Sequence, residues 1–274
     1  MAISMNDIKA LRTLTGAGMM DVKKALEEAN GDHDKAVELI RKRGQAIAAK
    51  RSERSAEQGC CLAVSDGDFA CIVAVQCETD FVAKNEDFIA MTEEILAAAK
   101  ESKPKSKEEL LATTLKSGRT VEQTITDRSG VTGEKMELGA YEFIEAPATV
   151  VYMHPGNMLS AIVGFNESVS EDMGKEIAMQ VASMNPVAVD EAGVPQEIKD
   201  RELNIAMDKA REAGKPENLL ERIAQGSLNK FYEEFTLLKQ ASILDGKKSV
   251  AELLKGESKT LTVTGFKRVN LNQD

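Results

Sequence analysis

Four cysteines lie within an 18-residue window, and thiols of this kind can bind metal ions or form disulfides. They are Cys60, Cys61, Cys71 and Cys77. A zinc site is disfavoured because there is no C-x-x-C pair and the only histidines are His33 and His154. The segment is typical of two short strands, where cysteine is a common small buried residue. We therefore expect buried, free thiols and no metal site.

The common motifs of nucleotide binding and hydrolysis are missing from the sequence. It contains no G-x-x-x-x-G-K-[ST], G-x-G-x-x-G, G-x-S-x-G or H-E-x-x-H. Gly214-Lys215-Pro216 lacks the upstream glycine and the hydroxyl residue of a phosphate-binding loop, so we interpret it as a turn. No carboxylates pair in an evidently apolar setting. We expect no catalytic residues, no cofactor and no nucleotide bound by the chain itself.

One segment, from Glu78 to Asn85, places bulky apolar side chains where a strand gives way to a helix. Phe81 and Val82 are flanked there by Asp80 and Lys84. Connections of this kind often present side chains to other molecules. The local pattern alone nevertheless favours Phe81 as a core residue beneath the following helix.

Charge is spread unevenly along the 274 residues. The net charge is −10, with +3 in residues 1–54 and −13 in the remainder. The basic residues Arg41, Lys42, Arg43, Lys50, Arg51 and Arg54 are interpreted as a solvated helix face. The acidic bulk, the absence of Trp and the low aromatic content argue against nucleic acid as the main partner. With no membrane-length apolar run and no export signal, we expect a cytoplasmic protein.

The first 44 residues predict three short helices. Ile8, Leu11 and Leu14 repeat every three residues and are expected to lie together on the inner face of the first helix. Asn30-Gly31 ends the second helix, Asp32 caps the third, and Gly44 is expected to close it. Residues 45–59 are expected to form a partly helical linker.

Two units that mix strands and helices follow. In the first, strands 60–64 and 68–77 meet at the turn Asp66-Gly67, and helices are expected over 86–100, over 108–115 and from a capping box at Thr120. In the second, strands are expected over 136–145, 149–154 and 158–165, then a helix that a capping box at Ser168 starts and Asn185-Pro186 stops.

The last third of the chain predicts an antiparallel pair of long charged helices. They cover 195–213 and 217–240 and are joined by the Gly-Lys-Pro turn. A short helix capped by Ser249 and a strand over 261–269 complete the chain.

Four segments resemble those of one known family. The first is Thr15-Gly16-Ala17-Gly18-Met19-Met20-Asp21-Val22-Lys23-Lys24-Ala25-Leu26 with Glu28-Ala29-Asn30-Gly31-Asp32. The second is Thr79-Asp80-Phe81-Val82-Ala83-Lys84. The others are Gly214-Lys215-Pro216 with Phe231 and Leu237, and Val263-Thr264-Gly265-Phe266. Together they resemble bacterial elongation factor Ts, the family of guanine-nucleotide exchange factors that act on the GTPase elongation factor Tu in translation elongation.

The resemblance implies an α+β fold made of four parts. Residues 1–54 would form a three-helix module like a ubiquitin-associated (UBA) domain, together with the start of a linker. Residues 55–144 would form the N-terminal core subdomain. Residues 145–184 and 241–274 would form the C-terminal core subdomain, with 185–240 inserted as an antiparallel helical hairpin, or coiled coil.

The resemblance also implies a function and its residues. Thr79, Asp80, Phe81, Val82, Ala83 and Lys84 would bind the GTP-binding domain of elongation factor Tu and disturb its Mg²⁺ and phosphate site, so that GDP leaves and GTP loads. Phe81 would then point outward, against the local pattern. The resemblance implies that the chain is not an enzyme and that neither a nucleic acid nor a membrane is among its partners.

Two further contacts are implied. Met19, Met20 and Lys23 of the module would bind a helix of the partner, although the two methionines could instead fill the small core of the module. His154 and Gly156 would bind a second partner domain. The segment Tyr152 to Leu159 departs from the family pattern near Asn157, where it lacks the usual arginine.

Two questions stay open. A homodimer or a two-plus-two complex with the partner is compatible with the sequence. A rival from another class is an adaptor that binds a ubiquitin-like or ribosomal protein through residues 1–54. The two functions differ in whether the core keeps its own contact with elongation factor Tu.

Overall fold

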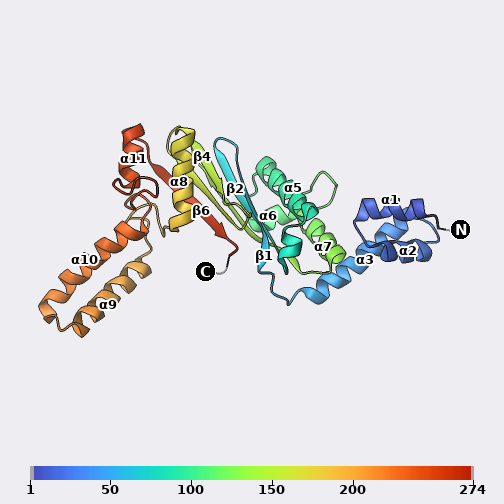
Figure 1. Cartoon of the computed structure of the whole chain (residues 1–274), viewed down its shortest axis with the longest axis horizontal. Helices are drawn as coiled ribbons and strands as arrows, with labels where there is room; N and C mark the ends of the chain where they lie inside the picture. Colours follow the sequence, from blue (N-terminus) through green and yellow to red (C-terminus); the bar gives the residue numbers. More distant parts are fainter. Residues whose placement is uncertain (1–2, 273–274) are drawn as a thin grey trace.

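The computed structural model describes residues 3–272, which form an elongated molecule (Figure 1). Its helices are α1 (Met5–Thr15), α2 (Met19–Glu28), α3 (His33–Arg51), α4 (Asp80–Ala83), α5 (Glu86–Ser102), α6 (Lys107–Ala112), α7 (Val121–Thr132), α8 (Glu171–Met184), α9 (Gln196–Glu212), α10 (Glu217–Phe235) and α11 (Val250–Glu257). Its strands are β1 (Gln58–Ser65), β2 (Phe69–Cys77), β3 (Met136–Glu145), β4 (Ala148–Met153), β5 (Leu159–Phe165) and β6 (Val263–Asn270). The helices α1–α3 lie at one end and the pair α9–α10 at the other.

The three N-terminal helices pack around a small apolar core. Val22, Ala25 and Leu26 of α2 are fully buried in it. Leu14, however, is 73% exposed, so its predicted place on the inner face of α1 is wrong. Each step of three residues turns the side chain about 60° backward around the helix, and two such steps carry Leu14 off the buried face.

The third helix is longer than its sequence predicts. It continues through Gly44 to Arg51, so Gly44 does not close it and the expected linker is helical over its first part. Gly44 instead faces Gly130 of α7, where a Cβ built on Gly130 lies 2.2 Å from the Cα of Gly44. The absence of side chains at both positions lets the two helices touch through their backbones.

The first sheet has the strand order β1-β2-β3, all antiparallel. Asp66-Gly67 forms the β1–β2 connection as predicted, with Gly67 in the left-handed region that its turn requires. Helices α4 to α7 cover one face of this sheet, and Phe88 of α5 is fully buried beneath them. α6 ends at Ala112, three residues before the end predicted for that helix.

The second sheet has the strand order β4-β5-β6, also antiparallel. Helices α8 and α11 cover one of its faces, where Ile177 and Leu254 are buried. The remaining faces of the two sheets pack against each other through alanine, cysteine and isoleucine side chains. That shared layer contains Cys61, Ala63, Ala70, Ile72, Ala74 and Ile162.

Two of the three predicted helix N-terminal caps are present in the structure. Those at Thr120 and Ser249 are confirmed by reciprocal hydrogen bonds. The box predicted at Ser168 is wrong, since α8 begins at Glu171 with Ser170 as its N-cap. The hydroxyl of Ser170 donates to the carboxylate of Glu257, 2.6 Å away, so it ties α8 to the end of α11 rather than capping its own helix.

Helices α9 and α10 form a projecting antiparallel pair joined by the turn around Gly214 (Figure 1). Val194, Leu228 and Tyr232 are buried at its base. α10 ends at Phe235 rather than at Gln240 as predicted, because the chain next runs alongside Ala188 in a short parallel bridge. Gln240 is buried and accepts a hydrogen bond from Gln180 of α8.

The cysteines lie in β1 and β2 and are buried and free, as the sequence predicts. Among residues 3–272, no group of three or more His, Cys, Asp or Glu side chains is placed to hold a metal ion. Within the same described part of the chain, no helix combines the length and apolar character needed to cross a membrane.

Candidate partner-binding site

The segment after β2 forms the short helix α4, which presents Phe81 to solvent. Thr79 caps the helix by accepting a hydrogen bond from the backbone N–H of Val82. Ala83 is buried and Val82 is half-buried in the first core, whereas Phe81 is 84% exposed. Two of the four helical side chains therefore hold α4 on the core, and an unsupported aromatic ring points outward. Phe81 is not the core residue that its local pattern favours.

The charged residues of α4 bind each other. The Nζ atom of Lys84 donates to the Asp80 carboxylate at 2.7 Å. That hydrogen bond, together with the positive charge of Lys84, holds the pKa of Asp80 below its usual range. The Lys84 side chain is largely exposed and that of Asp80 is about half exposed, so this pair can open at little cost when another charged molecule approaches.

The entrance to α4 is tied to the α7–β3 connection. The backbone N–H and the hydroxyl of Thr79 both donate to the carboxylate of Glu134, at 3.1 and 2.7 Å. Glu134 thus binds the residue that caps α4. Sequence spacing gives no sign of this contact, because the two residues are 55 positions apart.

The preceding residue, Glu78, is tied to the end of α3. Its carboxylate accepts hydrogen bonds from Arg51 at 3.2 Å, from Arg54 at 3.1 Å and from the backbone N–H of Lys135 at 2.6 Å. Burial by itself raises the pKa of Glu78, but the Lys135 N–H and the two arginines outweigh it, so the pKa lies below its ordinary value. Glu78 therefore stays charged in the folded protein near neutral pH.

The basic residues of α3 and of the segment after it are mostly exposed, as the sequence indicates, but most of them also pair with carboxylates. Arg51 and Arg54 bind Glu78, Arg41 pairs with Asp127 of α7, and Arg43 pairs with Glu28 of α2. Most of this positive charge is thus matched by carboxylates of the same chain. Sequence analysis missed the acidic partners because they lie on other elements.

A hollow of about 920 Å³ brings α4 together with the β4–β5 turn. Its lining includes Phe81 and Lys84 from the α4 segment and Gly156 and Met158 from the chain between β4 and β5. Two of the segments singled out by their sequence, 79–84 and the region around Gly156, therefore share one surface.

The β4–β5 turn holds His154 and Gly156 at the surface. The Tyr152 hydroxyl lies 3.0 Å from Nδ1 of His154, and both His154 and Gly156 are exposed. Gly156 has a φ of 94°, which side-chain-bearing residues rarely adopt. The carbonyl of Asn157 accepts the N–H of Cys61 at 2.7 Å, which fixes the turn to β1.

The predicted module residues lie apart from this surface. Met19 and Met20 begin α2, at the end of the molecule occupied by the N-terminal helices (Figure 1). Met20 is 63% exposed and Met19 is partly exposed, so neither fills the core of the three-helix unit. Lys23 is exposed and pairs with Glu27 one turn further along α2.

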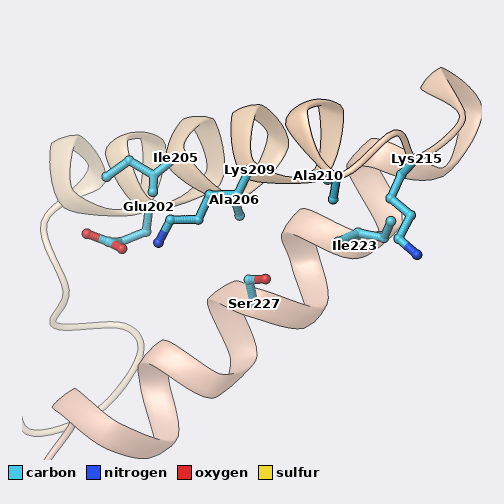
Figure 2. A pocket seen from close by; sticks show the side chains of 9 residues that line it. Glu202, Ile205, Ala206, Lys209, Ala210, Lys215, Ile223 and Ser227 are labelled. Carbon is cyan, nitrogen blue, oxygen red and sulfur yellow. The ribbon is translucent and has the colours of Figure 1, made fainter.

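A second, smaller hollow lies between α9 and α10, a feature that sequence analysis did not predict. Its volume is about 320 Å³. Figure 2 shows Ala206 and Ala210 of α9 opposite Ile223 and Ser227 of α10. Small side chains on α9 leave this space open. It holds no group of nucleophilic or metal-binding side chains.

Comparison with known proteins identifies a family. A family model described as "Elongation factor TS" matches residues 78–273, a stretch that begins at Glu78 and includes α4. Elongation factor Ts of Porphyromonas gingivalis is 57% identical over 274 residues, covering 100% of both chains. The protein of that name from Azobacteroides pseudotrichonymphae is 52% identical, again with 100% of both chains covered. The one from Christiangramia forsetii is 47% identical over 98% of each.

Proposed function

The chain belongs to the elongation factor Ts family, and from this membership we propose that it binds elongation factor Tu carrying GDP and promotes GDP release, so that GTP can load. The observation that supports this most directly is Phe81, an exposed aromatic ring on a helix whose neighbouring side chains are anchored. On this proposal the protein is an exchange factor acting in the cytoplasm, with no catalytic residue or cofactor of its own.

The mechanism follows from how a GTPase holds its nucleotide. Backbone amides, a lysine and a Mg²⁺ ion bind the phosphates. A protein that binds the nucleotide-free form more tightly than the GDP form must weaken GDP binding by the same factor. Phe81 would enter an apolar pocket of the GTP-binding domain and shift the element that supports the Mg²⁺ ligands. Asp80 and Lys84 would exchange their mutual ion pair for contacts with the partner.

The size of this effect is bounded by the burial of one aromatic ring. Fully burying a Phe side chain is worth roughly 1.5–3 kcal/mol. If all of that energy distorts the Mg²⁺ site, nucleotide affinity falls by about 10–150-fold. A single ring therefore accounts for part of the exchange activity, and further contacts must also favour the nucleotide-free partner.

Two other surfaces would supply those contacts. Met19, Met20 and Lys23 of the UBA-like module would bind a helix of the GTP-binding domain, where flexible thioether side chains suit an irregular apolar surface. His154 and Gly156 would bind a second partner domain beside the hollow that they share with α4. We propose on the same basis the division of the chain into residues 1–54, 55–144, 145–184 with 241–274, and the helical hairpin 185–240.

The direct test is stopped-flow release of a fluorescent GDP from elongation factor Tu, with and without this protein. We expect release to accelerate and to saturate as the protein concentration rises. Release that stays at the spontaneous rate at every concentration would overturn the proposal.

A second experiment separates this function from the adaptor function. In the double variant Met19→Ser with Met20→Ser, an adaptor that acts through the three-helix module loses its partner. An exchange factor keeps its core contact and still accelerates GDP release at saturating concentration. Complete loss of acceleration in this variant, with an unchanged melting temperature, would contradict the role given to the core.

A further inference from the structure

Glu78 joins three separate parts of the chain at the entrance of α4. Arg51 is the last residue of α3, Arg54 follows it, and the Lys135 N–H comes from the α7–β3 connection. The Glu78 side chain is only 14% exposed, so its three donors act in a partly shielded site. Hydrogen bonds to a charged acceptor are stronger than neutral ones. These hydrogen bonds therefore hold the chain in place at Glu78, three residues before Phe81.

The direction of helix α4 depends on the hydrogen bonds made by the residues just before it. It has four residues, far fewer than an isolated helix needs for stability in water. Glu78 is the residue before its cap and is held by Arg51 and Arg54. Glu134 binds the cap itself, Thr79. The direction in which α4 presents Phe81 is thus set by contacts made at residues 78 and 79, together with burial of Ala83.

The helix α3 connects Glu78 with the N-terminal helices. It runs without interruption from the three-helix core, where Ala36 is buried, to Arg51 at Glu78. Midway, Gly44 lies against Gly130 of α7, and α7 leads into Glu134 and Lys135. The helix α3 is therefore connected to the start of α4 in two ways. Arg51 contacts Glu78 directly, and α7 leads to Glu134 and Lys135, which contact Thr79 and Glu78.

We infer that Glu78, held by Arg51 and Arg54, is a positioning residue that sets the direction of Phe81 relative to the N-terminal helices. This inference deepens the proposed exchange function and rests on it. Once the other surfaces are bound, Phe81 speeds GDP release only if it points in the direction that enters its pocket, so a misdirected ring lowers the maximal rate more than the affinity. The Glu78 cluster sets that direction through its hydrogen bonds at the start of α4.

The test uses Glu78→Gln in the full chain, with Glu145→Gln as the matched control. Glu145 forms an exposed ion pair with Lys105 at the far end of β3, so its variant loses one carboxylate and one ion pair away from α4. GDP release from elongation factor Tu is measured over a range of protein concentrations. For Glu78→Gln we expect the maximal rate to fall about tenfold while the half-maximal concentration changes less than about threefold. For Glu145→Gln we expect both to match the wild type.

This pattern differs from that of a role confined to stability. A variant that is partly unfolded has fewer active molecules, so its half-maximal concentration rises while its maximal rate stays the same. That outcome, or a maximal rate equal to the wild type, would overturn the inference. If the wild type itself fails to accelerate GDP release, the proposed function fails, and the role assigned to Glu78 in it fails too.

A second measurement needs no partner. The backbone N–H groups of Ala83 and Lys84 donate to Thr79 and Asp80 within α4, and their hydrogen exchange reports opening of that helix. We expect exchange about tenfold faster in Glu78→Gln and unchanged in Glu145→Gln. Equal exchange in all three proteins would overturn the claim that Glu78 orders α4.

A third experiment replaces the two arginines that bind Glu78. The double variant Arg51→Gln with Arg54→Gln should lower the maximal rate as Glu78→Gln does, and combining all three changes should lower it little further, because one cluster is removed in each case. Arg43→Gln is the control, since Arg43 pairs with Glu28 and does not contact Glu78. Fully additive losses would contradict a single positioning cluster.

Discussion

Gly44 of α3 and Gly130 of α7 touch through their backbones. A Cβ on Gly130 would lie 2.2 Å from the Cα of Gly44, a separation that real Cβ atoms do not show. The contact brings α3 close enough to α7 for Arg41 to reach Asp127. The attachment of the N-terminal helices to the first core therefore depends on the absence of two side chains.

Gly130→Ala should destabilise the protein, because the added methyl group forces α3 and α7 apart. Overpacking of this kind usually costs about 1–3 kcal/mol, and the better helix propensity of alanine offsets up to about 1 kcal/mol of that. We expect a lower free energy of unfolding by urea denaturation. Gly226→Ala is the matched control, since Gly226 lies within α10 with open space around it. That variant should be as stable as the wild type or more so, and an equal gain for Gly130→Ala would refute the close contact.

Phe81→Ala should leave the fold intact and slow GDP release. An exposed ring contributes under about 1 kcal/mol to stability, and its loss should reduce the acceleration of release by up to the 10–150-fold bound set by its burial. The comparison is Phe88→Ala, since Phe88 is fully buried on α5. That variant should lose about 3–5 kcal/mol of stability. A Phe81→Ala protein that melts much earlier yet accelerates release normally would make Phe81 a structural residue.

Local sequence signals correctly predicted a hairpin turn and the starts of two helices. The Asp66-Gly67 turn between two β-rich runs gives the β1–β2 hairpin, and the capping boxes at Thr120 and Ser249 mark the starts of α7 and α11. These signals work because turn and cap geometry depends on residues within four positions of each other.

The features that position Phe81 could not be predicted in this way. Glu78 binds arginines 24 and 27 positions away, and Thr79 binds Glu134 across 55. Periodicity carries no information about such pairs. The incorrect prediction for Gly44 has the same cause. Glycine often ends a helix, but here Gly44 lies within α3 and contacts Gly130 of a helix that is distant in sequence.

The four thiols should be unreactive in the folded protein. Burial raises the pKa of Cys60 and Cys61 to about 11 and that of Cys71 and Cys77 to about 12, so almost no thiolate is present at neutral pH. Titration with a chromophoric disulfide reagent should detect none in the native protein and four after unfolding in guanidinium. Adding one exposed thiol through Lys116→Cys should give one rapid reaction in the native state. Rapid labelling of the wild type would disprove the burial of these strands.

The Glu78 cluster should also make stability depend on pH in a defined direction. The folded-state pKa of Glu78 lies below its ordinary value of 4.5, so the unfolded chain takes up the proton first as the pH falls. The stabilisation is therefore fully present above about pH 5 and is lost as the pH falls through the folded-state pKa.

Urea denaturation of the wild type and of Glu78→Gln checks this. At pH 7 the variant should be less stable by about 1–3 kcal/mol, because the arginines and the Lys135 N–H lose a charged acceptor. Below about pH 5 the difference should shrink as the pH falls through the folded-state pKa of Glu78, since the wild-type carboxyl becomes neutral as well. Glu145→Gln, on an exposed ion pair, should stay within about 0.5 kcal/mol of the wild type at pH 7. A difference for Glu78→Gln that is unchanged at acid pH would show that the charge of Glu78 does not hold the cluster together.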